Sequence, residues 1–173
     1  MRVPVHGATI GDAERDAAIR VAESGWYTYG PHCQEFERKL KAYTGKRDAV
    51  VCNSGSSANL LALYALAQPE LGTRAIQPYD EIITCAVGFP TTVNPIILMG
   101  CTPIFVDCDI PTLNPTLAAI ENAITTRTRA VMLAHTLGMP LPVGLRELCD
   151  KRGLWLIDDC CDALGSPRTM EGH

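Results

Sequence analysis

The hydrophobic positions of the chain first follow a helical period and then fall into short apolar runs. Apolar residues three and four apart predict a helix over residues 10–24. Phe36, Leu40 and Tyr43 repeat at helical spacing and predict a second helix, which ends at Gly45. The aromatic turn between the two helices, residues 25–31, is expected to cover the edge of a core, with the lining of a pocket as the alternative.

From residue 49 onward, apolar runs alternate with amphipathic stretches. The predicted strands are 49–52, 81–86, 103–106, 129–134 and 154–157. The predicted helices begin at Ala58, Pro90, Asn114 (as the cap) and Val143. Because parallel strands need a crossover helix between them, about five such units predict an α/β fold with a parallel, doubly wound sheet. We expect an N-terminal helical segment over 1–48, a sheet domain over 49–166 and a divergent tail over 167–173.

Polar or small residues follow each predicted strand. They are Asn53 to Ser56, Val87 to Pro90, Asp107 to Asp109, His135 with Thr136, and Asp158 with Asp159. In an open parallel sheet, ligands bind beyond the carboxyl ends of the strands. We therefore expect these residues to gather at one edge of the sheet, called the rim below.

The first of these segments has the pattern of an anion site. Asn53-Ser54-Gly55-Ser56-Ser57 lies between a predicted strand and a predicted helix. The start of a helix presents unpaired N–H groups and the positive end of a dipole, to which hydroxyls can be added. A phosphate fits such a corner. The alternative is that Ser54 or Ser56 caps the helix without any ligand.

The common nucleotide motifs are absent from the sequence. Neither G-x-G-x-x-G nor G-x-x-x-x-G-K-[ST] occurs, which argues against a dinucleotide oxidoreductase or a nucleotide hydrolase. The rim instead combines the anion corner with an aromatic plane at Phe89 and a carboxylate at Asp159. Pyridoxal phosphate would use all three, because it is a flat phosphate whose electron sink works best with an acid at the ring nitrogen. The alternative for Asp159 is a helix cap or a loop acceptor, which is the usual role of an Asp after a strand.

Composition and charge limit the partners and the cellular compartment that we expect for this protein. The 173 residues carry a net charge of −4 and no basic run, which argues against a nucleic-acid partner. No apolar stretch reaches the roughly 20 residues of a membrane span, and the N-terminus lacks the pattern of a signal peptide. We therefore expect a cytoplasmic protein without membrane contact. The eight cysteines show no C-x-x-C spacing, so we expect reduced thiols rather than disulfides.

Five motifs in order carry a family resemblance. They are SGSSANLLALYAL, EIITCAVGFPTTVNPIILMG, PIFVDCD, AVMLAHTLGMP and GLWLIDDCCDALGS. Together they resemble the sugar-modifying, fold-type I pyridoxal phosphate enzymes of the DegT/StrS type, over about residues 24–166. Within that family they most resemble the lipopolysaccharide-biosynthesis branch that acts as CDP-4-keto-6-deoxyglucose 3-dehydrase.

The resemblance implies specific roles. Gly55 and Ser56 would hold the cofactor phosphate, with Ser57 nearby. Phe89 would stack on the pyridine ring, and Asp159 would pair with the ring nitrogen. These residues are expected to form the cofactor site of a PLP-dependent large domain.

One further residue bears on the reaction. Asp162 matches the position beside the ring oxygen that is usually His or Gln in the aminotransferases, and with HTLGMP it favours the dehydrase branch. That branch removes the 3-hydroxyl of a nucleotide-linked 4-keto-6-deoxyhexose with pyridoxamine phosphate. It also needs a [2Fe-2S] centre and an iron–sulfur flavin reductase, and its members are typically homodimers. A PLP-dependent nucleotide-sugar aminotransferase stays open as the alternative.

The catalytic residue is not assigned. The family's Schiff-base lysine, or the histidine that replaces it in dehydrases, would follow the Asp159 motif, whereas every lysine here precedes it: Lys39, Lys41, Lys46 and Lys151. His173 does not match the family's histidine motif. We therefore expect an incomplete N-terminal part of a larger enzyme, inactive alone, with the iron–sulfur ligands outside it. A non-catalytic module that binds a partner subunit, a nucleotide sugar or nothing stays open.

Overall fold

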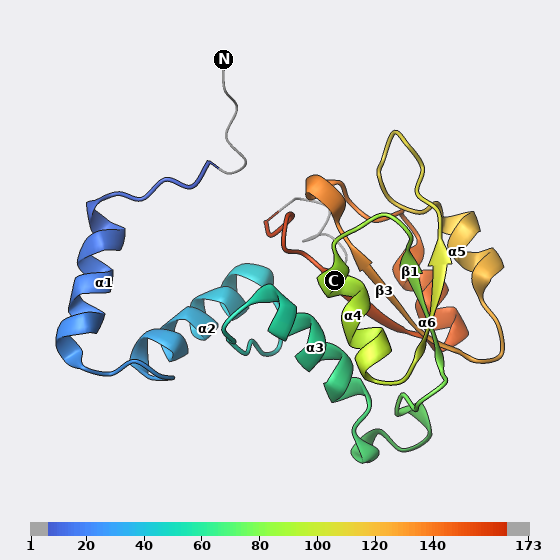
Figure 1. The fold of residues 1–173 in the computed structure, drawn as a ribbon, viewed down its shortest axis with the longest axis horizontal. Coiled ribbons are helices and arrows are strands. Elements are labelled where there is room, and N and C mark those ends of the chain that lie inside the picture. The colour runs from blue at the N-terminus through green and yellow to red at the C-terminus, as the bar shows by residue number, and fades with distance from the viewer. Residues whose placement is uncertain (1–6, 166–173) are drawn as a thin grey trace. The chain divides into compact units, whose positions relative to one another are not determined.

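In the computed structural model of the protein, residues 7–165 are described (Figure 1). The chain divides into two compact units, residues 1–49 and 50–173. The predicted tail 167–173, with His173, lies outside the described residues.

The first unit consists of two helices. Helix α1 spans Asp12–Ser24, and its N-cap residue, Gly11, donates its N–H to the Glu14 carboxylate at 2.7 Å. Helix α2 spans Pro31–Thr44. Gly25 and Gly45 end the two helices in the left-handed conformation, with φ of 68° at each. Both predicted helices are confirmed.

The second unit is built on a parallel sheet of four strands. The strands are β1 (Glu81–Cys85), β2 (Thr102–Val106), β3 (Thr128–Ala134) and β4 (Trp155–Asp159). Their order is β2-β1-β3-β4, and all three pairings are parallel. The helices are α3 (Gly55–Leu66), α4 (Pro90–Leu98), α5 (Leu117–Ala123) and α6 (Leu145–Arg152), with short 3-10 helices at Pro69–Arg74 and Thr136–Gly138. The predicted α/β fold is confirmed.

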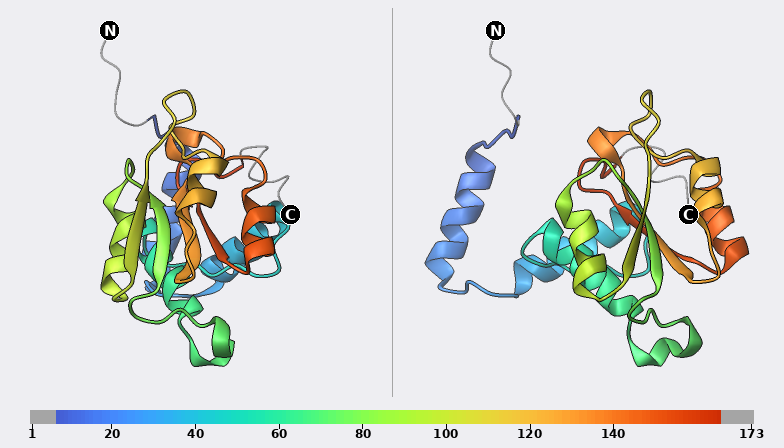
Figure 2. Two further views of the ribbon diagram at one scale, coloured as in Figure 1. Left: turned by 90° about the vertical axis from the view of Figure 1, so that its right-hand side faces the viewer. Right: turned by 45° about the vertical axis from the view of Figure 1, so that its right-hand side comes forward.

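Alternating side chains of the strands feed two separate cores. On one face Ile82, Met132 and Ile157 pack with Leu63 of α3 and Ile96 of α4. On the other face the core joins strands β1, β2, β3 to helices α5 and α6; its buried members include Ile83, Val106, Val131, Leu133, Ile120, Leu145 and Leu148. The sheet is therefore covered on both faces, as Figures 1 and 2 show. The consequence for the site is that α3 and α4 lie on the same side.

The predicted strand over residues 49–52 is wrong. No strand forms there within residues 7–165, and Val50 is 72% exposed. A strand is held by the ladder of an adjacent strand, and the four-stranded sheet contains no pairing with this run. The apolar run therefore precedes α3 without forming part of the sheet.

The predicted cap of α5 is also wrong. Thr116 caps this helix, because its hydroxyl accepts the N–H of Ala119 at 3.1 Å. Asn114 is buried instead, and its side-chain amide donates to the carbonyl of Met139 at 2.9 Å. Asn114 therefore connects the loop after β2 to the loop after β3, a long-range contact that its position before a proline did not indicate.

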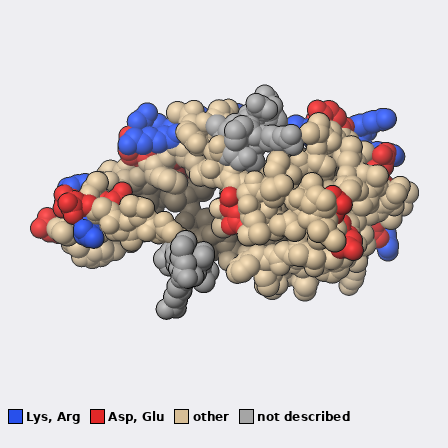
Figure 3. Space-filling model, turned by 90° about the horizontal axis from the view of Figure 1, so that it is seen from above, with Lys and Arg blue, Asp and Glu red and all other residues tan. Residues whose placement is uncertain are grey.

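Charged side chains are dispersed over the face of the molecule that Figure 3 shows. On the face drawn in Figure 3, Lys and Arg form small groups, several of them beside Asp and Glu. Within the part of the chain that the structure describes, no helix is both long and apolar enough to cross a membrane.

Candidate functional site at the carboxyl ends of the strands

The start of helix α3 combines a cap with open donors. The Ser54 hydroxyl accepts the N–H of Ser57 at 3.2 Å, so Ser54 caps the helix. The same hydroxyl donates to the Ser57 hydroxyl at 3.2 Å. The N–H groups of Gly55 and Ser56 belong to the first turn, where a helix has no internal acceptor for them. Capping by Ser54 and an anion site at Gly55 and Ser56 are therefore compatible.

Gly55 brings the loop after β4 close to this helix start. A Cβ atom added at Gly55 would lie 4.0 Å from the Sγ of Cys161. Cys161 follows Asp159 by two residues and donates its backbone N–H to the Asp159 carboxylate at 3.1 Å. The predicted anion corner and the predicted ring-nitrogen acid are thus neighbours at the rim.

The Asp159 carboxylate is held by three donors. Asn59 donates its side-chain amide to the Oδ2 atom of Asp159 at 2.7 Å, and the Thr92 hydroxyl donates to the same oxygen at 2.9 Å. The N–H of Cys161 reaches Oδ1. A carboxylate oxygen accepts hydrogen bonds, so each of the three donors has an acceptor in this group. The carboxylate is therefore held in a fixed orientation at the rim.

Phe89 lies at the start of α4, three residues before Thr92. It is the N-cap residue of that helix, and its side chain is 71% exposed. Thr92 of α4 contacts Asp159, and α4 packs beside α3. The backbone of Phe89, at the start of α4, therefore lies on the same side of the sheet as Ser56 and Asp159. The three predicted contributors thus gather on one side of the sheet.

Asp162 is engaged with the loop after β3. Its Oδ2 atom accepts the backbone N–H of Leu137 at 3.1 Å. A Cβ atom added at Gly138 would lie 3.3 Å from the backbone oxygen of Asp162. One oxygen of the Asp162 carboxylate is therefore occupied by the protein itself.

His135 is the buried titratable residue of the rim. Its side chain is 5% exposed, and neither ring nitrogen has a hydrogen-bond partner among residues 7–165. Burial lowers the pKa of His135, while the nearby carboxylates of Asp158 and Asp159 oppose that shift. The imidazole is therefore neutral near pH 7.

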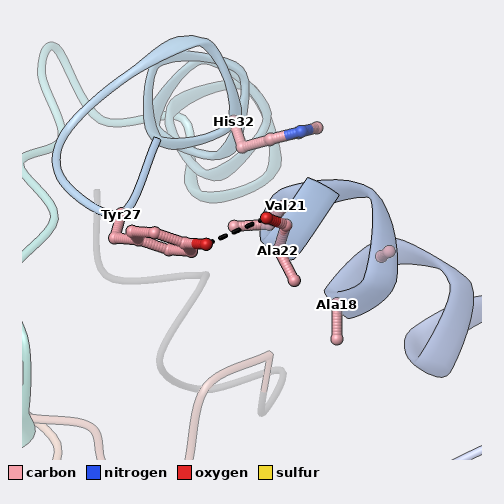
Figure 4. A pocket seen from close by; sticks show the side chains of 6 residues that line it. Ala18, Val21, Ala22, Tyr27 and His32 are labelled. Carbon is pink, nitrogen blue, oxygen red and sulfur yellow. Dashed lines mark hydrogen bonds between the residues drawn. The ribbon is translucent and has the colours of Figure 1, made fainter. Parts of the chain in front are cut away.

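The aromatic turn of the first unit differs from expectation. Trp26, Tyr27 and Tyr29 are at least half exposed, so they do not cover a core. Tyr27 instead lines a shallow apolar pocket with residues of α1 and with His32, and its hydroxyl donates to the carbonyl of Ala22 at 2.9 Å (Figure 4). The alternative, that an aromatic residue of the turn lines a pocket, is the one the structure shows for Tyr27.

No disulfide joins any of the eight cysteines, all of which lie within residues 7–165, and the reduced state of their thiols stays a prediction.

Sequence reasoning missed Asn59 and Thr92. Both are nine-tenths buried or more and both contact Asp159, from 100 and 67 positions away along the chain. One feature of the sequence could have indicated them: each is a polar residue on the inner face of an otherwise apolar helix. A buried polar side chain requires a hydrogen-bond partner.

Comparison with known proteins identifies relatives that match nine tenths or more of this chain. The lipopolysaccharide biosynthesis protein RfbH of Salmonella typhimurium is 50% identical over 172 residues, which are 99% of this chain and 39% of the relative. The dTDP-4-dehydro-2,6-dideoxy-D-glucose 3-dehydratase of Saccharopolyspora spinosa is 45% identical over 92% of this chain and 35% of its own length. Among solved structures, E. coli GDP-4-keto-6-deoxy-D-mannose-3-dehydratase with bound hydrated PLP has a TM-score of 0.80 at 32% identity, over 91% of this chain and 40% of that one.

These matches confirm the family resemblance and the fold. The chain spans about two fifths of the lengths of these relatives. A family model described as the DegT/DnrJ/EryC1/StrS aminotransferase family matches residues 8–173. The chain therefore belongs to the DegT/DnrJ/EryC1/StrS aminotransferase family.

Proposed function

We propose that this chain forms the cofactor-holding part of an enzyme that acts on a nucleotide-linked 4-keto-6-deoxyhexose. The reaction is loss of the 3-hydroxyl group, of the CDP-4-keto-6-deoxyglucose 3-dehydrase type, with pyridoxal phosphate or pyridoxamine phosphate as cofactor. One observation carries the proposal: the Asp159 carboxylate is held by Asn59 and Thr92 on the same side of the sheet as the open start of α3. The names of two relatives, both 3-dehydratases of nucleotide sugars, support it.

The residues of the rim fit such a cofactor. Gly55 and Ser56 offer backbone N–H groups, and Ser57 adds a hydroxyl, at the positive end of α3, which suits a phosphate. Phe89 presents an exposed ring for a flat partner. Asp159 supplies the carboxylate that a protonated ring nitrogen requires.

The bound cofactor supplies an electron sink for carbanion chemistry at the sugar. The residues of this chain prepare that chemistry. Asp159 would accept the hydrogen bond of the protonated ring nitrogen, because its three donors hold the carboxylate in a fixed orientation. The helix start at Gly55 and Ser56 fixes the phosphate, and Phe89 restricts the tilt of the ring. The groups that move protons at the sugar are assigned to no residue of this chain.

Asp162 has two roles to reconcile. The proposed position beside the ring oxygen requires a free acceptor, and Oδ2 is already used by the N–H of Leu137. We therefore assign the ring-oxygen contact to Oδ1, which can accept a hydrogen bond from the ring hydroxyl. This assignment places Asp162 between the loop after β3 and the cofactor.

The complete reaction needs partners beyond this chain. We propose a homodimer that receives electrons from an iron–sulfur flavin reductase through a [2Fe-2S] centre, as expected of this dehydrase branch. Among the described residues, no group of three or more His, Cys, Asp or Glu side chains could hold a metal ion. We therefore assign none of the eight cysteines to that centre.

Transamination of the same class of sugar is the second candidate function. It is favoured by the family to which the chain belongs, which is named an aminotransferase family. The two reactions differ in their product. A transaminase returns an amino sugar that keeps its 3-hydroxyl, whereas a dehydrase releases the 3-hydroxyl as water.

Binding of pyridoxamine 5′-phosphate to the 173-residue chain tests the proposed site. Asp159→Asn should weaken binding at least about tenfold, because a neutral amide cannot hold the ring-nitrogen proton; tenfold corresponds to about 1.4 kcal/mol. Asp158→Asn is the matched control, since Asp158 is the adjacent carboxylate and pairs with Arg146 at 3.6 Å. The control should stay within about twofold of the wild type. Equal affinities for wild type and Asp159→Asn would contradict the site, and no binding by either would favour a non-catalytic module.

A further inference from the structure

Asn59 is a polar residue on the inner face of α3. Its side chain is 7% exposed, and its Nδ2 atom donates to Asp159 at 2.7 Å and to the carbonyl of Thr91 at 3.3 Å. An ionised carboxylate and a carbonyl oxygen are both acceptors, so the NH₂ end of the amide must face them. The contact with Asp159 is therefore fixed in direction.

The position of Asn59 along α3 links two parts of the site. It follows Gly55 by four residues on the same helix, which is one turn, or about 6 Å of helix rise. A single rigid element thus carries the phosphate donors at its start and the donor to Asp159 one turn later. The spacing between the two contacts is set by the helix and not by a loop.

The other two donors to Asp159 do not provide this link. The Thr92 hydroxyl comes from α4, and the N–H of Cys161 comes from the loop that directly follows Asp159 at the end of β4. A hydroxyl can rotate, whereas the planar amide of Asn59 is held by two acceptors at once. Asn59 is thus the donor that ties the carboxylate to the phosphate corner.

We propose that Asn59 is a positioning residue, which holds Asp159 at a fixed distance from the phosphate-binding start of α3 and so aligns the carboxylate with the cofactor ring nitrogen. This inference rests on the proposed function. Asn59 acts through Asp159 and touches neither substrate nor cofactor.

The first test needs no cofactor. Amide hydrogen exchange at Cys161 reports whether the Asp159 carboxylate stays in place, because that N–H is bonded to Oδ1. In Asn59→Ala the exchange rate of this amide should rise at least about fivefold, while the amides inside β4 keep their protection. Asn94→Ala is the matched control, because Asn94 is exposed on α4. Asn59→Leu, which keeps the volume and removes the donor, repeats the test if the alanine variant does not fold.

The second test uses two ring probes. Wild-type chain should prefer pyridoxamine 5′-phosphate to its analogue with CH in place of the ring nitrogen. Asn59→Ala should reduce that preference about tenfold, while the affinity for inorganic phosphate stays within about twofold. In an Asp159→Asn background, Asn59→Ala should add little further loss, because the two residues act as one unit.

The outcomes separate the inference from the proposed function. Unchanged exchange at Cys161 in both Asn59 variants overturns the positioning role, whatever the cofactor does. An equal loss of affinity for both ring probes also overturns it. Faster exchange at Cys161 together with no binding of either probe by the wild type supports the positioning of Asp159 and overturns the cofactor site.

Discussion

The carboxylate of Asp162 accepts the backbone N–H of Leu137 at 3.1 Å, across 25 positions of the chain. Leu137 has a φ of 52°, in the left-handed region that β-carbons disfavour. The hydrogen bond therefore holds a strained turn, between β3 and α6, against the loop that follows β4. Two loops of the rim are fixed to each other by this contact.

Removing the Asp162 carboxylate should loosen that turn. We expect Asp162→Ala to lower the free energy of unfolding by about 1 kcal/mol, the usual net contribution of such a hydrogen bond. Asp162→Asn keeps an acceptor oxygen of the same shape and should recover most of that loss. Urea unfolding of the three chains measures it, and identical midpoints for wild type and alanine variant would show that the bond contributes nothing.

The strain at Leu137 should be removable. Asn tolerates the left-handed region better than Leu, and the Leu137 side chain is 75% exposed, so little packing is lost. Leu137→Asn should therefore raise the free energy of unfolding by about 0.5–1 kcal/mol. Leu164→Asn is the matched control, because Leu164 is also exposed and its φ is not positive. If both variants change stability equally, the turn is not strained.

The sequence was sufficient to predict those helices and strands that are determined by local interactions. The four confirmed strands are short apolar runs, and Gly153 ends α6 with a φ of 67°, as its position predicts. Residues 49–52 have the same apolar character, but a strand also needs a neighbour, which a local pattern cannot show.

The same distinction applies to the candidate site. The rim residues that follow the four strands were predictable because parallel strands share one carboxyl edge, whereas the corner at Ser54 to Ser56 follows no strand in the described part of the chain. Asn59 could not be assigned from its surroundings, since its partner Asp159 is 100 positions away. The contact of Asn114 with Met139 could not be predicted either, because the two residues are 25 positions apart in the sequence.

A buried carboxylate at the opposite end of β1 should be important for stability. Glu81 is 2% exposed and accepts hydrogen bonds from the Thr125 hydroxyl and the Arg127 guanidinium. Glu81→Gln should lower the free energy of unfolding by about 2 kcal/mol, since hydrogen bonds to a buried charge are lost. Glu121→Gln is the matched control, because its ion pair with Arg152 is about half exposed and should contribute less than about 1 kcal/mol.

The pH dependence follows from the same contacts. The hydrogen bond from Thr125, then that from Arg127, lowers the pKa of Glu81 despite the opposing effect of burial. A lowered carboxyl pKa gives stability that is present above the unfolded value of about 4.3 and is lost as the pH falls through the folded value. Urea midpoints between pH 6 and pH 3 should fall less steeply in Glu81→Gln. Parallel curves for the two chains would rule out this role.

His135 should control stability in a higher pH window. Burial lowers its pKa, with Asp158 and then Asp159 opposing, so the folded protein resists protonation below the ordinary value of about 6.5. The unfolded chain binds that proton freely. Because the unfolded state then holds more protons, stability falls as the pH drops from about 6.5 toward the folded pKa.

Replacing His135 should remove this slope. His135→Leu leaves no titrating ring and no unpaired ring N–H in the buried site, so its unfolding free energy should be flat between pH 7 and pH 5 and should match or exceed that of wild type at pH 5. An equal slope in His135→Leu and wild type would mean that the ring is protonated without cost, which requires a partner for its nitrogens and contradicts its burial without one.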